Sequence, residues 1–282
     1  MANITNKEKQ ALVIRCLVEG MSVNSTVRTT GVSKPTILKL LNDVGYVAAR
    51  FQDRALRGLT CKRIEVDEVW TFIYAKERNV PKATNPPPEA GDVWLWTALC
   101  PDTKLMASWK LGDRTLSTAR VFMRDLASRL AGRVQITSDG HRPYVDAVSE
   151  SFGNKVDFAM LKKIYEREQL DILAEKISGY PNVDHISTSG VERQNLTLRM
   201  GARRYTRRTN AFSKKLHNHA CALALHYLHY NFCRIHSSIK VTPAMRAGLM
   251  NVPMNIGWIL ELVEQARPKP KRPAKYRPRV AA

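Results

Sequence analysis

Three short acidic phrases contain the residues of this chain that are best suited to chemistry. They are IEVDEVW at 64–70, ITSDG at 136–140 and SGVERQN at 189–195. Lysines and arginines outnumber acids by 45 to 25 in the 282 residues, so a net charge of +20 should attract polyanions. Carboxylates with apolar or helical flanks in such a chain indicate a metal site that faces a phosphate.

One carboxylate from each phrase is a candidate catalytic residue: Asp67, Asp139 and Glu192. Phosphodiester cleavage uses two divalent cations about 3.5–4 Å apart, which clamp the attacking and leaving oxygens. Hard oxygen ligands suit Mg²⁺ or Mn²⁺, so these acids are the predicted ligands of two such ions. Each acid alone is more often a turn, surface or helix-terminus residue, so the prediction depends on the whole set.

Two neighbouring acids compete with Asp67 for this role. In a strand, Glu65 shares the face of Asp67, whereas Glu68 points to the other side. Asp139 comes just past the end of another expected strand, where Gly140 allows a sharp exit. Adjacent strands would bring Asp67 and Asp139 together.

A region rich in β-type residues must position the first two acids. We expect an α/β fold with an RNase H-like mixed sheet and flanking helices. The segment 76–91 contains four prolines and should be a long exposed loop. The expected elements are strands at 64–75, 92–100 and 103–111, a helix from Ser117 to Leu130, and a fourth strand at 133–137.

The interval between Asp139 and Glu192 is expected to hold a fifth strand at 155–161 and an inserted helix from about Tyr165 to Ile177. Glu192 then follows Ser187, Thr188 and Ser189, any of which could cap a helix. Arg199 lies seven residues further on, two turns along the same face, where a cation can hold a phosphate.

The N-terminal residues predict three short helices, at 7–19, 23–30 and 34–42. A glycine turn at Gly31 separates the last two, which is the helix-turn-helix pattern, and the second helix of such a pair enters the major groove. The alternative is a small three-helix packing unit. The predicted DNA-binding residues here are Ser33, Lys34, Thr36 and Lys39.

A second basic region extends from Arg193 to Lys215, with eight cations and no acid. A solvated face is the common explanation for such a run, but beside an acidic site it favours contact with a DNA backbone. The predicted DNA-binding residues in this region are Arg193, Arg199, Arg203, Arg204, Arg207 and Arg208.

The chain divides into four expected parts. They are a helix-turn-helix module at 1–60, a catalytic domain at 61–210, a helical segment at 211–262 and a basic, disordered tail at 263–282. The N-terminus lacks the apolar core of a secretory signal, and no apolar run is long enough to span a membrane. A cytoplasmic location, associated with the nucleoid, is therefore expected.

Several phrases resemble the bacterial insertion-sequence-one transposases, a branch of the DDE transposases and integrases. The resemblance spans most of residues 25–250 and includes the segment HISTSGVERQNLTLRMGARRYTRRTNAFSKK, whose VERQNLTLR phrase is far more specific than a generic acid triplet. It implies Mg²⁺-dependent cutting and joining of DNA at the inverted repeats of a transposon, and insertion into target DNA, by a homo-oligomer of at least two protomers. It assigns the catalytic carboxylates to Asp67, Asp139 and Glu192 and their basic partner to Arg199.

Three departures from the family pattern accompany this resemblance. The chain lacks a zinc-binding segment before the helix-turn-helix. The interval between its second and third acids, 53 residues, is longer than in the best-known compact members of the family. Gly190 stands where a larger residue is expected and could loosen the helix of Glu192. A catalytically inactive DNA-binding regulator, or a structure-specific nuclease without strand transfer, is the alternative function.

Overall fold

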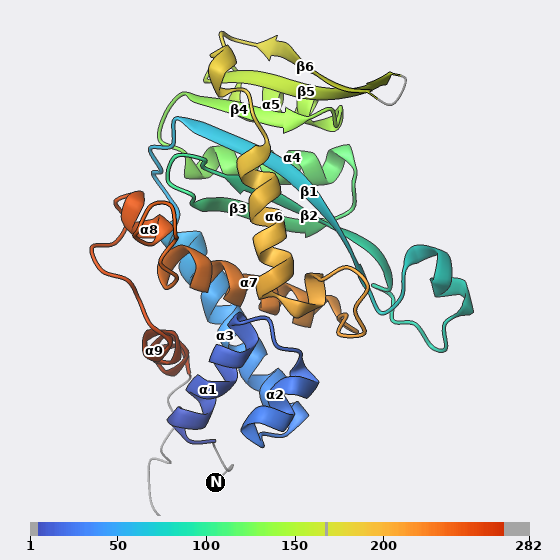
Figure 1. Cartoon of the computed structure of the whole chain (residues 1–282), viewed down its shortest axis with the longest axis vertical. Helices are drawn as coiled ribbons and strands as arrows, with labels where there is room; N and C mark the ends of the chain where they lie inside the picture. Colours follow the sequence, from blue (N-terminus) through green and yellow to red (C-terminus); the bar gives the residue numbers. More distant parts are fainter. Residues whose placement is uncertain (1–4, 167–168, 268–282) are drawn as a thin grey trace, which may run out of the picture.

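Three helices at one end of the molecule lead into a six-stranded sheet at the other (Figure 1). The computed structural model describes residues 5–166 and 169–267. The predicted basic tail therefore lies outside the described residues from 268 onward. Within the described part of the chain, no helix is both long enough and apolar enough to cross a membrane.

The sheet is mixed and has the strand order β3-β2-β1-β4-β5-β6. β1 pairs antiparallel with β2 and parallel with β4, and β4 pairs parallel with β5. This arrangement confirms the predicted mixed α/β class and is consistent with an RNase H-like fold. The strands are β1 (Arg63–Ile73), β2 (Gly91–Leu99), β3 (Met106–Gly112), β4 (Val134–Asp139), β5 (Val156–Glu166) and β6 (Gln169–Ser178).

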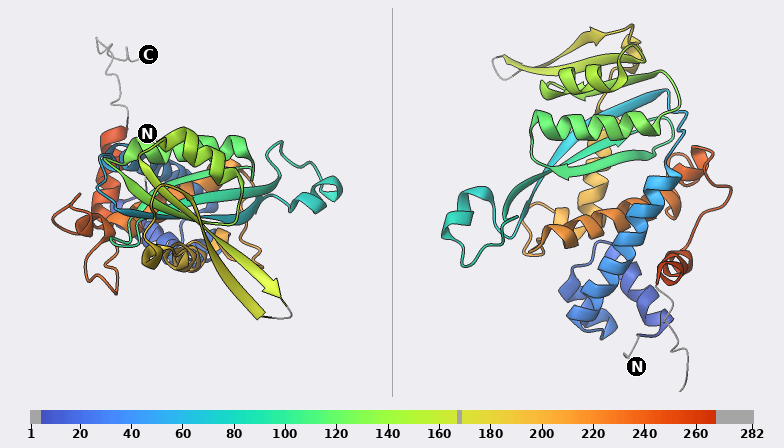
Figure 2. Two further views of the ribbon diagram at one scale, coloured as in Figure 1. Left: turned by 90° about the horizontal axis from the view of Figure 1, so that it is seen from above. Right: turned by 180° about the vertical axis from the view of Figure 1, so that it is seen from behind.

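The insert between the second and third acids contains a strand where a helix was expected. The predicted helix from Tyr165 to Ile177 is wrong, because β6 pairs antiparallel with β5 as a hairpin that extends beyond the sheet (Figure 2, left). The edge of β5 offers unpaired backbone N–H and C=O groups, and pairing with them overrides the helix propensity of the local sequence. Two residues of the predicted helix, at 167 and 168, lie outside the described residues.

The N-terminal helices are α1 (Lys7–Val18), α2 (Val23–Thr30) and α3 (Lys34–Ala55). α2 starts at Ser22, whose hydroxyl accepts the N–H of Ser25 at 3.0 Å, and it ends at Gly31, which has a φ of +68°. α3 runs well past its expected end at Asn42. Gly45 lies inside α3, at the point where that helix crosses α7 (Leu216–Phe232). A Cβ at this position would overlap Cys221, so the glycine allows the two helices to approach closely.

Helices cover both faces of the sheet (Figure 2). α4 (Leu116–Arg129) and α5 (Pro143–Phe152) lie on one face, and α6 (Ser189–Gly201) crosses the other. α7 packs against α3 and links the sheet to the N-terminal helices. The shorter elements are η1 (Glu77–Lys82), η2 (Val183–His185), η3 (Arg203–Tyr205), α8 (Pro243–Arg246) and α9 (Ile256–Ala266).

The alternation of side chains along β1 decides which helices each face meets. Val69 belongs to an apolar cluster with Val191 and Leu198 of α6, whereas Val66 and Trp96 pack in the core that contains α4 and α5. Odd-numbered side chains of β1, including those of Glu65 and Asp67, therefore face α6.

Candidate active site

The pairing of β1 with β4 aligns the first two candidate acids. Glu65 lies opposite Thr137 in this parallel pair, and continuing the register by two residues puts Asp67 level with Asp139. Asp139 is the last residue of β4, and its Oδ1 accepts the N–H of His141 at 3.0 Å as the chain turns away. The side chain of Asp139 is 36% exposed.

Asp67 lies under α6 and is held by hydrogen bonds to both carboxylate oxygens. Oδ1 accepts the N–H of Glu68 at 2.8 Å, and Oδ2 accepts the side-chain N–H of Asn195 at 2.7 Å. Burial raises the pKa of Asp67 to about 6, and the charges of Asp139 and Glu192 add to this increase. Asp67 is thus a buried carboxylate that its neighbour on β1 and the covering helix α6 both hold in place.

Asn195 is a site residue that the sequence analysis missed. It is 3% exposed, and its Oδ1 is buried without a hydrogen-bond partner in the described structure. It follows Glu192 by three residues on the same helix, a spacing that puts two side chains on one face. That spacing is the sequence signal that could have identified it.

Glu192 projects from the first turn of α6 and is exposed. Its Oε1 accepts the hydroxyl of Thr188 at 3.2 Å, and its backbone N–H donates to the carbonyl of the same residue at 3.0 Å. Thr188 occupies the N-cap position, but its side chain makes no capping hydrogen bond. Another residue therefore satisfies the first free N–H groups of α6.

That residue is Glu65, which was only a competitor of Asp67 in the sequence. Its Oε2 accepts the N–H of Val191 at 2.8 Å, and the side chain is 5% exposed. A carboxylate at a helix N-terminus is favoured by the helix dipole. Burial raises the pKa of Glu65, and the hydrogen bonds from the N–H groups of Val191 and Gly190 oppose this increase.

Gly190 is explained by the same contact. A Cβ at this position would lie 2.8 Å from Oε2 of Glu65, so a larger residue would displace the capping carboxylate. The expectation that Gly190 only loosens the helix is therefore incomplete, because the glycine admits the group that fixes the start of the helix.

Arg199 lies on α6, seven residues after Glu192 and on the same face of that helix. Burial lowers the pKa of Arg199, the charge of Arg207 lowers it further, and the charge of Asp67 opposes both. Arg199 is half-buried. The carbonyl of Arg199 also accepts the hydroxyl of Thr206 at 2.8 Å, which ties the second basic region to the helix.

Glu68 lies on the opposite face of β1 and forms a second acidic feature beside Asp139. Its side chain is 1% exposed and pairs with Arg114 at 3.1 Å, and burial raises its pKa to about 7. Arg114 lies 4.0 Å from Oδ2 of Asp139 and stacks over the ring of Trp94. The sequence analysis weighed Glu68 only as a competitor of Asp67, and it did not single out Arg114.

The predicted DNA-binding residues fall into two groups in the structure. Ser33, Lys34, Thr36 and Lys39 lie on α3 or at its start, and the Ser33 and Thr36 hydroxyls are 2.9 Å apart. Ser33 makes no capping hydrogen bond to the backbone, unlike Ser22. The exposed ones in the other group are Arg193, Arg203, Arg207 and Arg208, whereas Arg199 and Arg204 are half-buried.

The donor set of the site matches the chemistry of hard divalent cations. Three carboxylates supply oxygen ligands, and a cation among them would offset the burial and the repulsion that raise the pKa of Asp67. The unpaired Oδ1 of Asn195 adds a buried neutral oxygen next to Asp67. Among residues 5–166 and 169–267, no three His, Cys, Asp or Glu side chains are already close enough to hold a metal ion together.

The fold and this site together define a mixed α/β protein with two candidate acids on the central strands β1 and β4 and a third on the covering helix α6. No protein-family model matches the chain, and no curated protein matches its sequence significantly. Among solved structures, the chain is similar to a piggyBac transposase in a synaptic complex with hairpin DNA. The TM-score is 0.44 at 11% identity, over 93% of this chain and 71% of that chain.

Two further similarities are to structures of the Mos1 transposase. One is a paired-end complex with the left transposon end, with a TM-score of 0.25 and 11% identity over 56% of this chain and 60% of that chain. The other is a Mos1 mariner paired-end complex with Mn, with a TM-score of 0.22 and 12% identity over 54% and 58% of the two chains.

Proposed function

We propose that this protein is a DNA transposase of the DDE type that cuts and joins DNA at the ends of an insertion sequence. The observation that carries the proposal is the strand register that puts Asp67 of β1 level with Asp139 of β4, beneath the helix α6 that carries Glu192. The resemblance of the VERQNLTLR phrase to the insertion-sequence-one transposases supports the same function.

The residues of the site have distinct parts in this proposal. Asp67, Asp139 and Glu192 would hold Mg²⁺ or Mn²⁺, and two such ions, when bound, activate the attacking oxygen and stabilise the leaving one. Asn195 and the N–H of Glu68 fix the orientation of the Asp67 carboxylate. Arg199, which lies near this carboxylate, would hold a phosphate of the scissile strand.

The proposed reaction has two steps that share one geometry. First, a water oxygen attacks the phosphorus at the element's end, the P–O3′ bond breaks and a 3′-hydroxyl is released. That hydroxyl then attacks a phosphorus of the target DNA, a new P–O3′ bond forms and a 3′-hydroxyl of the target leaves. In the first step a water oxygen replaces O3′ on phosphorus, and in the second step the released 3′ oxygen replaces O3′ of the target. Each is a direct displacement at phosphorus, so no covalent intermediate with the enzyme is required.

One observation favours a second candidate, a DNA-binding regulator without catalysis. Among the described residues, no three metal-binding side chains lie close enough together to hold an ion. An inactive relative of an enzyme would have the same arrangement. The regulator would keep the N-terminal helices and the basic region and would bind the same DNA. Cleavage, rather than binding, therefore separates the two functions.

The test is cleavage of a labelled duplex from the end of the protein's own element with Mg²⁺ or Mn²⁺. We expect nicking by the parent protein, and none by Asp67→Asn, Asp139→Asn or Glu192→Gln at unchanged DNA binding. Asp146→Asn, an exposed acid on α5, is the matched control and should cut like the parent. Tight binding without cleavage by the parent protein would support the regulator instead.

A further inference from the structure

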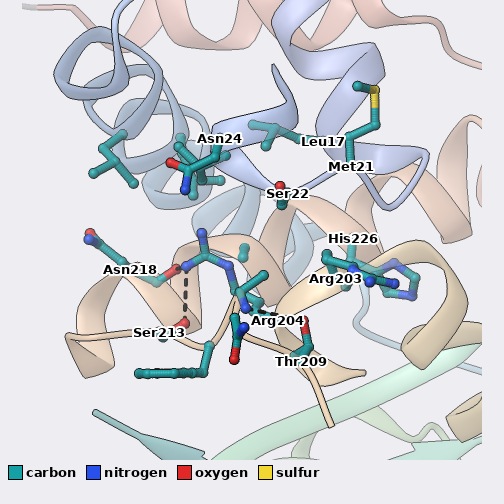
Figure 3. Close-up of a pocket in the computed structure, with 18 of the residues that line it drawn as sticks. Leu17, Met21, Ser22, Asn24, Arg203, Arg204, Thr209, Ser213, Asn218 and His226 are labelled. Carbon is teal, nitrogen blue, oxygen red and sulfur yellow. Dashed lines mark hydrogen bonds between the residues drawn. The ribbon is translucent and has the colours of Figure 1, made fainter. Parts of the chain in front are cut away.

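A cavity of about 580 Å³ lies between the N-terminal helices and the segment that follows α6 (Figure 3). One wall comes from the end of α1, from α2 and from the first turns of α3, and the other from residues 201–214 and α7. Among the described residues that line it there is no aspartate or glutamate. Its cationic lining residues are Arg28, Lys34, Arg203, Arg204, Arg208 and Lys214.

None of these six cations forms an ion pair with any residue that the structure describes. Four of them line the cavity from residues 201–214, and the other two line it from the N-terminal helices. Positive charges on two facing walls repel one another, and an anion between them would offset this repulsion. The concentration of unpaired cations in one hollow therefore points to an anionic ligand.

Arg204 gives this hollow a fixed, partly buried charge. Its Nη1 donates to the hydroxyl of Ser213 at 3.1 Å and to the carbonyl of Asn218 at 2.9 Å, and both partners are neutral. The rest of its guanidinium lies toward Ser22 and Asn24 on the opposite wall (Figure 3). A cation with only neutral partners is costly to bury, so its position favours an anion from outside.

The wall opposite Arg204 is also suited to an anion. Ser22, Val23 and Asn24 form the N-cap and first turn of α2, where the backbone N–H groups and the helix dipole favour negative charge. The turn that precedes this wall packs closely against the end of α6. A Cβ at Gly20 would overlap the carbonyl of Met200. The backbones of the two walls therefore approach one another closely at this end of the cavity.

Charge also connects the cavity with the candidate active site. Arg199 is close enough to both Asp67 and Arg207 for their charges to act on it, and Arg208 lines the cavity one residue further on. A polyanion in the cavity could therefore continue along these arginines toward the acids of the site.

We propose that this cavity is a groove for the phosphodiester backbone of duplex DNA, in which cations from both walls hold successive phosphates. The identity of the polymer as DNA rests on the proposed function, whereas the preference for phosphodiesters follows from the charges of the groove. Lys34, which the helix-turn-helix pattern assigns to recognition, then contacts phosphate from the groove. Binding through the groove is independent of base sequence.

The test is DNA binding by Lys34→Gln/Lys214→Gln, which removes one exposed cation from each wall. Anisotropy of a labelled duplex is measured in EDTA, so the result does not depend on catalysis or on the metal. Each lost phosphate contact lowers the slope of log K against log salt by about 0.9, so the slope should fall by about 1.8. The ratio of the parent's affinity to the variant's affinity should therefore decrease about tenfold as the salt concentration rises from about 50 to about 200 mM.

The loss should be equal for the element's end and for a duplex of random sequence. The matched control is Arg54→Gln/Lys155→Gln, two exposed cations outside the groove, and it should lose little. Arg28→Gln/Arg208→Gln is an independent pair that should repeat the loss, and thermal unfolding verifies that each variant is folded. Parental binding by both groove pairs, equal loss in the control, or a loss confined to the element's end would each overturn the groove.

Discussion

The carboxylate of Glu65 on β1 accepts the N–H of Val191 at 2.8 Å and thereby caps α6 from the neighbouring sheet. The contact joins the strand of Asp67 to the helix of Glu192 within one or two residues of both acids. A capping group on the same chain segment, such as Thr188, would satisfy the helix but would not fix it to the strand. The Glu65–Val191 hydrogen bond is therefore a determinant of the distance between two candidate ligands.

Gly190→Ala should lower the free energy of unfolding by about 1 kcal/mol, because displacing Glu65 weakens a charged hydrogen bond by more than the gain in helix propensity. In a Glu65→Ala background the obstruction is absent, and the same substitution should be neutral or stabilising. Urea unfolding of the four proteins measures this coupling. Gly132→Ala, whose Cβ meets nothing within 4 Å, is the control. Additive effects would show that the two positions do not interact.

Asn195→Ala should reduce cleavage about 10–100-fold, the usual effect of losing a group that orients a metal ligand. The amide lowers the pKa of Asp67, so its removal should also move the acidic limb of the pH–rate profile to higher pH. Gln194→Ala removes the neighbouring buried amide on α6 and should leave that limb unchanged. A lower rate with the same limb would indicate that Asn195 contributes only to packing.

Stability should fall as the pH rises from about 4 to 7, because Asp67 binds its proton more tightly in the folded protein. Its folded pKa of about 6 lies above the ordinary value of 3.8, so the unfolded chain holds fewer protons in this window. The loss attributable to Asp67 is about 3 kcal/mol, and Asp67→Asn should remove it.

Mg²⁺ should restore part of this stability at pH 7.5, because it binds the ionised acids of the folded state. We expect Mg²⁺ to raise the melting temperature of the parent protein at pH 7.5, and to do so far less at pH 4.5, where Asp67 is protonated. Asp67→Asn should show little response at either pH. An equal shift in the parent and in Asp67→Asn would place the ion elsewhere.

Gly45→Ala should destabilise the protein by about 3 kcal/mol, at the upper end for an overpacked core, because its Cβ would overlap both Cβ and Cα of Cys221. Both atoms belong to the rigid part of α7, so neither helix can relieve the overlap by turning a side chain. Denaturant unfolding measures the effect, and Gly132→Ala again provides the open comparison. A change of less than about 1 kcal/mol would mean that α3 and α7 can separate without cost.

Local pattern in the sequence determined the strands around the first two acids. The apolar run that surrounds Asp67 and the Asp-Gly at the end of β4 are features of a strand and of its end, and both are encoded within a few residues. The period of side chains along a strand also indicates that Glu65 and Asp67 share a face. The sequence thus predicted which carboxylates could meet.

Only the tertiary structure decided how these carboxylates are held. The roles of Glu65, Asn195 and Gly190 each depend on a contact between β1 and α6. The two partners of each contact are more than 120 positions apart in the sequence. The hairpin of β5 and β6 likewise depends on a free sheet edge, which no local propensity reports. The cationic groove arises because the N-terminal helices are seated beside the end of α6. Such contacts depend on the packing of whole elements, so spacing along the chain does not contain them.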